Sequence, residues 1–121
     1  MTSWMRDECE QLSSIAAVYQ KHGKLRLAEN SYKLIIDLRE KNSDTDSLEL
    51  AVTYYKLAEV NSDLGNYSKA RPLYTKAVSI FEKHNGDHQL SALWYWDALV
   101  KLRSISDEKG LDWEGDLIRE A

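Results

Sequence analysis

The side chains best suited to metal binding are scattered through this sequence rather than gathered in motifs. His84 and His88 are four residues apart, the spacing at which two ligands share a helix face, but Gly86 between them interrupts a helix. The acidic run from Asp44 to Glu49 has the carboxylates of a calcium loop without its glycine and its distant glutamate. We therefore predict no metal site, and we interpret the acidic run as the cap of a following helix.

A catalytic nucleophile is equally hard to find. Cys9 is the only cysteine, so it has no intrachain disulfide partner, and a reducing compartment suits it best. Glu10 beside it would not lower its pKa, and no histidine is paired with it in sequence. Without a nucleophile–base pair, a phosphate loop or a metal cluster, the sequence predicts a protein that is not an enzyme and has no cofactor.

The composition and the N-terminal sequence limit which compartments and which partners we expect for the protein. The net charge of −4 argues against nucleic acid and anionic membranes, because both favour a basic surface. The N-terminus becomes polar and acidic at once, unlike a signal peptide, and no segment has the ~20 apolar residues of a membrane span. We predict a single cytoplasmic domain over residues 1–121 that binds neither nucleic acid nor membrane.

An internal repeat is the strongest pattern in the chain. Residues 24–41 and 66–83 match at a spacing of 42 residues, and the segments before them match as well. The paired positions include Ala28 with Ala70, Tyr32 with Tyr74, Ile35 with Ala77, Ile36 with Val78, and Gly23 with Gly65. A fixed period of this kind is typical of helical solenoids, in which each repeat is one pair of helices.

Apolar residues recur at helical spacing on both sides of each glycine. Leu12, Ile15, Ala16 and Tyr19 form one such stripe, and Gly23 can end the helix by adopting a positive φ. Because the connections at the glycines are short, each pair of helices must form an antiparallel hairpin. The helices predicted in this way cover about residues 3–22, 25–41 and 47–64, and a fourth carries Ala70, Tyr74, Ala77, Val78 and Phe81.

A fifth helix should begin near Gln89, in a register that the sequence leaves open. A shift of 42 residues places Leu99 on Leu57, whereas a shift of 41 places Tyr95 on Tyr54. A short amphipathic helix after Gly110 is predicted by the spacing of Trp113, Leu117, Ile118 and Ala121. The predicted fold is thus an all-α superhelix of about two and a half helical hairpins.

Small residues recur where these helices must cross. Ala16 and Ala58 occupy the first helix of each pair, and Ala28 and Ala70 occupy the second. A methyl group at a crossing lets two helix axes approach to the close end of the ~8–10 Å range. One pair cannot bury its apolar faces alone, so the pairs must stack. Stacking with a constant rotation produces a concave face lined by the first helices.

These residues resemble the tetratricopeptide repeat. The resemblance is carried by Leu57, Ala58, Gly65, Tyr67, Ala70, Tyr74 and Ala77. The 42-residue spacing, together with Gly86 to His88, resembles the longer variant found in kinesin light chains. The resemblance implies one repeat over about residues 9–45, a second over 51–86 and a partial third over 89–121.

What the resemblance implies is a protein-binding adaptor that holds a partner peptide or helix in its concave groove. The expected groove residues are Glu10, Ser13, Ala17 and Gln20 in the first copy, Val52, Tyr55, Glu59 and Ser62 in the second, and Trp94, Asp97, Lys101 and Ser104 in the third. Ser14 and Lys56 stand where kinesin light chains carry asparagines that hold a ligand's backbone. The mixture of apolar side chains and scattered charges suits a partly apolar partner rather than an acidic one.

The tryptophans suggest a second kind of interaction. Trp94, Trp96 and Trp113 lie in the last third of the chain, and Trp94 and Trp96 place aromatic surface on more than one side of the fifth helix. Three interpretations stay open: a C-terminal segment that caps the array over Trp96, a surface for homodimer formation, and contact with the groove ligand.

Overall fold

The computed structural model describes residues 2–84 and 89–109, and over this part of the chain it contains five α-helices and no strand. In chain order they are α1 (Ser3–Lys21), α2 (Leu25–Lys41), α3 (Leu48–Asp63), α4 (Tyr67–Lys83) and α5 (Gln89–Lys109). These boundaries agree closely with the expected ones, and the predicted all-α fold is confirmed. The short helix expected around Trp113 lies outside the described residues.

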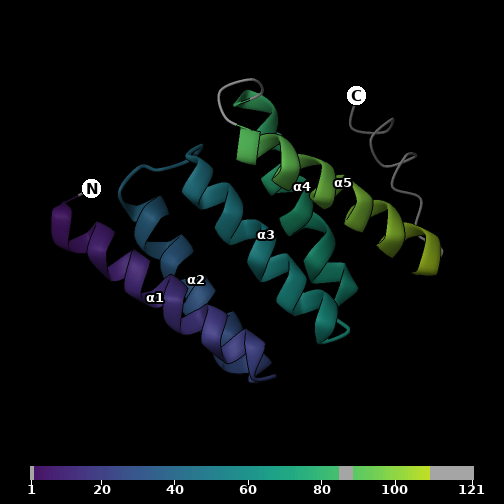
Figure 1. Ribbon diagram of the computed structural model, residues 1–121, viewed down its shortest axis with the longest axis horizontal. Coiled ribbons are helices and arrows are strands. Elements are labelled where there is room, and N and C mark those ends of the chain that lie inside the picture. Colours follow the sequence, from purple (N-terminus) through teal and green to yellow (C-terminus); the bar gives the residue numbers. More distant parts are fainter. Residues whose placement is uncertain (1, 85–88, 110–121) are drawn as a thin grey trace.

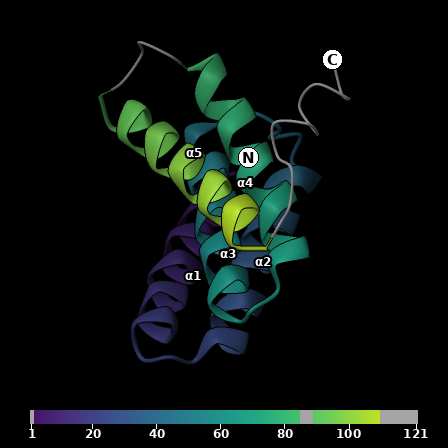
Figure 2. The same cartoon turned by 90° about the vertical axis from the view of Figure 1, so that its right-hand side faces the viewer.

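The helices follow one another across the molecule as stacked antiparallel pairs (Figure 1). α1 packs on α2 and α3 packs on α4, while α2 also packs on α3 and α4 on α5. α5 is therefore placed as the first helix of a third pair. Figure 2 shows the same succession from the α5 end. This is the predicted arrangement of about two and a half hairpins.

The two hairpin turns have the same geometry. Gly23 and Gly65 have φ values of 74° and 82°, a left-handed conformation that strains residues with a Cβ atom. The amide of Lys24 donates to the carbonyl oxygen of Tyr19 at 2.8 Å, and the amide of Asn66 donates to that of Asn61 at 2.8 Å. Both turns therefore close the preceding helix as predicted and send the chain back along it.

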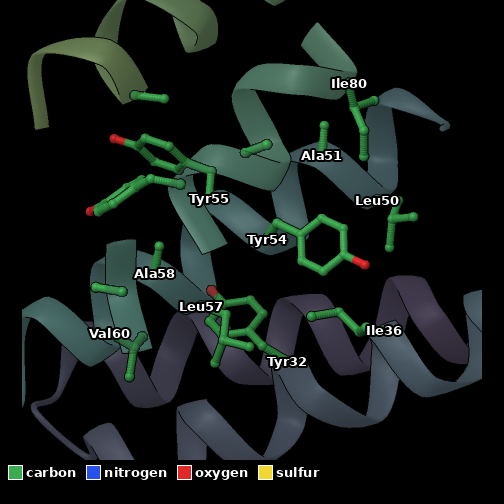
Figure 3. Close-up of a cluster of buried hydrophobic side chains, with 14 of the residues drawn as sticks. Tyr32, Ile36, Leu50, Ala51, Tyr54, Tyr55, Leu57, Ala58, Val60 and Ile80 are labelled. Carbon is green, nitrogen blue, oxygen red and sulfur yellow. The ribbon is translucent and has the colours of Figure 1, made fainter. Parts of the chain in front are cut away.

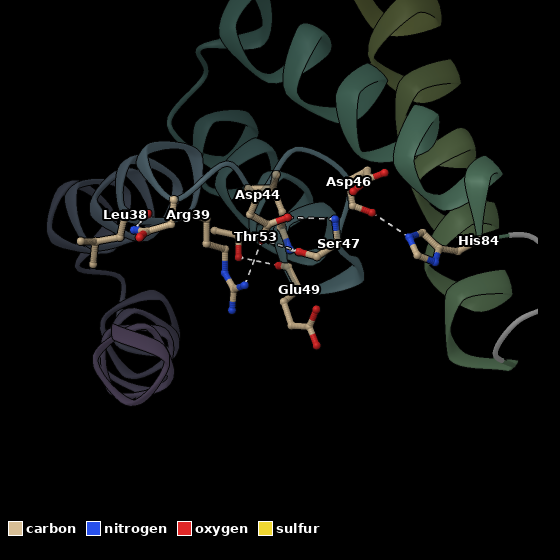
Figure 4. A network of polar contacts seen from close by, with 10 residues as sticks. Leu38, Arg39, Asp44, Asp46, Ser47, Glu49, Thr53 and His84 are labelled. Atoms are coloured by element: carbon tan, nitrogen blue, oxygen red, sulfur yellow. Dashed lines mark hydrogen bonds and ion pairs between the residues drawn. The ribbon is translucent and has the colours of Figure 1, made fainter. Parts of the chain in front are cut away.

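A polar cluster in the connection between α2 and α3 ties the two hairpins together (Figure 4). Ser47 Oγ caps α3 by accepting from the amide of Leu50 at 3.1 Å, and it donates to Asp44 Oδ2 at 2.6 Å. Asp44 also accepts from Arg39 Nη1 at 3.1 Å. His84, at the end of α4, donates from Nε2 to the carbonyl oxygen of Asp46 at 2.7 Å. The predicted cap of α3 is therefore supplied by Ser47.

The core is built on small residues at the helix crossings. The predicted alanines are all fully buried, and they are Ala16, Ala28, Ala58 and Ala70. Tyr32 and Tyr74, each 1% exposed, fill the space beside them. Figure 3 shows Tyr32 of α2 beside Leu57 of α3, in the layer where the two hairpins meet.

Ile15 departs from the expected core stripe, because it is 46% exposed. Its counterpart 42 residues later, Leu57, is 3% exposed and lies against α2. No helix among residues 2–84 and 89–109 lies in the equivalent place beside α1. Ile15 thus has the side chain of a core position without the neighbour that would bury it.

The structure settles the register of α5. Tyr54 Oη donates to Glu40 Oε1 at 3.1 Å, and Tyr95 Oη donates to Glu82 Oε1 at 3.3 Å. Glu82 follows Glu40 by 42 residues, but Tyr95 follows Tyr54 by 41, so the same contact recurs one residue early. A shift of 42 would also place Val100, which is 64% exposed, at a fully buried position of α3. The 41-residue shift therefore describes α5.

Candidate functional site

Most of the predicted groove residues lie around two separate hollows on the side of the molecule formed by α1, α3 and α5. The first hollow, of about 340 Å³, is lined by four of them, Glu10, Ser13, Val52 and Trp94, and we call it the apolar hollow. The second, of about 430 Å³, is lined by another four, Glu59, Ser62, Lys101 and Ser104, and we call it the polar hollow. Ala17 and Asp97 are exposed outside both linings.

The apolar hollow also draws on the second helices. Ile35 of α2 and Phe81 of α4, which are 1% and 2% exposed, belong to its lining together with Leu48 of α3. Arg39 belongs to it as well, and it precedes Phe81 by 42 residues. Sequence reasoning missed these residues because it assigned the groove to the first helices alone. The repeat spacing that relates Arg39 to Phe81 is the signal that could have found them.

The charges around the apolar hollow are unequal. Glu10 and Glu49 are exposed carboxylates in its lining. Arg39, the cation in the lining, is held at 3.1 Å by Asp44, and this ion pair is largely buried, with side-chain exposures of 11% and 16%. The hollow therefore combines an apolar interior with two solvated negative charges.

Cys9 lines the same hollow as an inert thiol. Its side chain is 2% exposed. Burial raises the pKa of the Cys9 thiol, the positive charge of Arg39 opposes this, and the negative charges of Glu8 and Asp44 add to it. A thiol with a raised pKa stays protonated near neutral pH, so Cys9 contributes an apolar surface rather than a nucleophile.

Tyr55 contacts one lining residue of each hollow. Its ring lies edge-on to Trp94, which lines the apolar hollow, with 4.8 Å between ring centroids. On its other side the ring meets Tyr74, which lines the polar hollow, at 5.7 Å. Tyr55 Oη donates to Asp97 of α5. Tyr55, expected among the groove residues, is only 4% exposed, because α4 and α5 cover its side chain.

A line of hydrogen bonds crosses the groove from α1 to α5. Tyr32 Oη donates to Gln20 Oε1 at 3.1 Å, and Gln20 Nε2 donates to Glu59 Oε1 at 2.6 Å. Lys101 Nζ donates to the other oxygen of Glu59 at 2.6 Å. These contacts, which we call the polar crossing, engage both carboxylate oxygens of Glu59. Gln20 therefore braces the groove from α1 to α3.

The Glu59 carboxylate should make the free energy of unfolding decrease in acid. Burial alone would raise the pKa of Glu59, but hydrogen bonds from Lys101 and Gln20 and the charge of Lys101 lower it below its ordinary value. A carboxylate whose pKa is lowered by folding stabilises the fold above its unfolded-state pKa, about 4.3. That contribution, about 1 kcal/mol or less for a partly exposed pair, is lost as the pH falls through the folded-state pKa.

We therefore expect the free energy of unfolding in urea to decrease between about pH 5 and pH 3, and Glu59→Gln to make that decrease smaller. The pKa of Asp44 is also lowered, because hydrogen bonds from Ser47 and Arg39 outweigh its burial, so the variant should keep part of the pH dependence. An identical pH dependence in the two proteins would show that the polar crossing does not form in solution.

The exposed face of α5 was assigned incompletely from the sequence. Trp94, Asp97 and Lys101, chosen by the 42-residue spacing, lie against α3. The 41-residue shift points instead to Leu93, Trp96 and Val100, which are 67%, 64% and 64% exposed, and we call them the α5 row. Trp96 is thus exposed, as a self-association surface requires, whereas Trp113 lies outside the described residues.

Within residues 2–84 and 89–109, no group of three or more histidine, cysteine, aspartate or glutamate side chains is placed to hold a metal ion. Over the same residues, none of the helices combines the length and the apolar character that crossing a membrane requires. His84 contacts the backbone of Asp46, and His88 lies outside the described residues.

The comparison with known proteins bears directly on this arrangement. A family model described as tetratricopeptide repeat matches residues 9–83, from the first turns of α1 to the end of α4. No curated protein matches the chain. Members of this family are in general non-catalytic modules for protein–protein interaction, and their stacked helices form concave binding surfaces. Since the match spans most of the first hairpin, all of the second and more than half of the 121 residues, this protein belongs to the tetratricopeptide repeat family.

Proposed function

We propose that this protein is a non-catalytic adaptor that binds a partner peptide or helix in its groove, with an apolar side chain of the partner seated in the apolar hollow. The observation that supports this most is the hollow itself, a space of about 340 Å³ between helices of all three repeats. We also propose that residues 1–121 act as one cytoplasmic domain, and that nucleic acid and membranes are not its partners.

The size and the lining of the apolar hollow suit one large apolar side chain. Val52 and Trp94 lie on the first helices, and the buried Ile35 and Phe81 complete an apolar surface. Apolar pockets with a few polar groups at fixed positions are typical of binding sites. A peptide or an amphipathic helix that docks in a groove gains most of its affinity from such anchor residues.

A library of displayed random peptides tests this proposal. We expect the peptides enriched on the protein to share an apolar anchor and to lose at least about tenfold in affinity for Val52→Asp, because that change places a charge in the hollow. Val18→Asp is the matched control, since Val18 is 55% exposed on α1 and lies outside the hollow lining. Enriched peptides that bind both variants equally would exclude the hollow as their site.

Self-association through α5 is a second candidate function. It is supported by the α5 row, whose side chains stand one and two turns apart on a single face of the helix and are about two-thirds exposed. In α3 the corresponding face, which includes Tyr55, is covered by another helix of the chain. Light scattering that reports a monomer mass at high concentration would exclude this function.

A further inference from the structure

The apolar hollow carries an inference that rests on the proposed function and specifies the partner. We propose that the hollow selects a segment in which the apolar anchor stands next to a lysine or an arginine. The carboxylates of Glu10 and Glu49 are the groups that recognise this cation. Glu10 comes from α1 and Glu49 from the first turn of α3, and both line the hollow and are exposed.

The charged residues in the lining show which ligand charge the hollow prefers. Glu10, Glu49 and Arg39 are the charged members of the lining. Arg39 is already engaged by the Asp44 carboxylate at 3.1 Å, so its charge is compensated within the protein. The structure shows no ion pair for either glutamate among residues 2–84 and 89–109. The lining therefore presents uncompensated negative charge to a ligand.

A lysine of α3 lies close to another member of the lining, Trp94. Lys56 Nζ stands 5.3 Å from the ring centroid of Trp94, two turns along α3 from Glu49. Opposite charges thus lie two turns apart on α3, with Glu49 in its first turn and Lys56 beside Trp94. A bound segment would accordingly be oriented, with its basic residue toward the first turn of α3.

The affinity and the selectivity come from different parts of the site. The anchor gains affinity by leaving water for a lining that includes Ile35, Val52 and Phe81. Exposed carboxylates attract a cation only modestly, up to about fivefold in affinity for each pair, and salt weakens the attraction. The polar hollow differs, because polar side chains such as Ser62, Asp63 and Ser104 dominate its lining and its Glu59 is already occupied by Lys101 and Gln20.

Three indole probes that differ in charge test the inference on the intact chain. Tryptamine is cationic, tryptophol is neutral and indole-3-acetate is anionic, while the ring that would enter the hollow is the same. Methyl NMR signals of Leu48 and Val52 report binding at the lining. We expect tryptamine to bind about fivefold or more tightly than indole-3-acetate at low salt, with tryptophol between them, and the difference to shrink as salt is added.

The double variant Glu10→Gln and Glu49→Gln supplies the matched control. It should bring tryptamine and indole-3-acetate to within about twofold of each other and leave tryptophol unchanged. Equal binding of the three probes to the unmodified protein, or tighter binding of indole-3-acetate, would overturn the inference and leave the proposed function standing. The absence of any shift at Leu48 and Val52 with all three probes would overturn both.

Discussion

Replacement of Tyr55 by alanine is expected to lower the free energy of unfolding by about 3–5 kcal/mol, the range for removal of a large buried aromatic side chain. The ring is 4% exposed and contacts Trp94 and Tyr74, so its loss leaves a void between α3, α4 and α5. Urea unfolding followed by far-ultraviolet circular dichroism measures the change.

Tyr55→Phe distinguishes the contribution of the ring to stability from that of the hydroxyl group. This variant keeps both ring contacts and loses only the hydrogen bond to Asp97, so we expect a cost of about 0.5–1.5 kcal/mol. If the alanine variant unfolds at the same urea concentration as the phenylalanine variant, the ring is not packed between α3, α4 and α5 in solution.

Ala70→Leu is expected to destabilise the protein by about 1–3 kcal/mol or more. Ala70 has no exposed surface and lies in the first turns of α4, where only a methyl group fits between the helices. A leucine side chain would force α4 away from its neighbours, because a packed interior has little free volume to accept it. The midpoint of thermal unfolding measures this effect.

The same substitution at an exposed alanine is the control. Ala17 lies on α1 and is exposed, so Ala17→Leu should change the stability by no more than about 0.5 kcal/mol. Equal unfolding midpoints for the two leucine variants would mean that Ala70 is not at a close helix crossing.

The helices and their pairing could be predicted because they depend on patterns local in sequence. Gly23 and Gly65 adopt the positive φ that a glycine allows at a helix end, and each closes a turn within six residues. Ala28 and Ala70 recur at one period and are both fully buried. A repeat provides two independent copies of the same evidence, which makes such inferences secure.

The candidate site was harder to predict because its surfaces form between helices. Tyr55 has the position of a groove residue within α3, but Trp94, far away in sequence, covers it. Whether Tyr55 is open or buried depends on the distance between α3 and α5, which no pattern within one helix reports. The apolar hollow is similar, since Ile35 and Phe81 enter it from helices that the repeat pattern assigns to the core.

The register of α5 shows how a difference of one residue changes a surface. Both shifts were available from the sequence, and only the 41-residue shift places Trp96 and Val100 on the exposed side. The Tyr95–Glu82 hydrogen bond, which repeats the Tyr54–Glu40 contact, distinguishes the two shifts. A pairing between separate helices was therefore needed to choose between them.

The polar crossing has a consequence for how the array comes apart. In a solenoid each unit is normally coupled only to its neighbours, so the ends can fray while the middle persists. Here one carboxylate receives Gln20 from the first unit and Lys101 from the third, each at 2.6 Å. When α5 detaches, Glu59 loses half of its partners and the brace to α1 weakens with it. Fraying at one end is thereby transmitted to the other, and the three units are expected to melt as a single cooperative block.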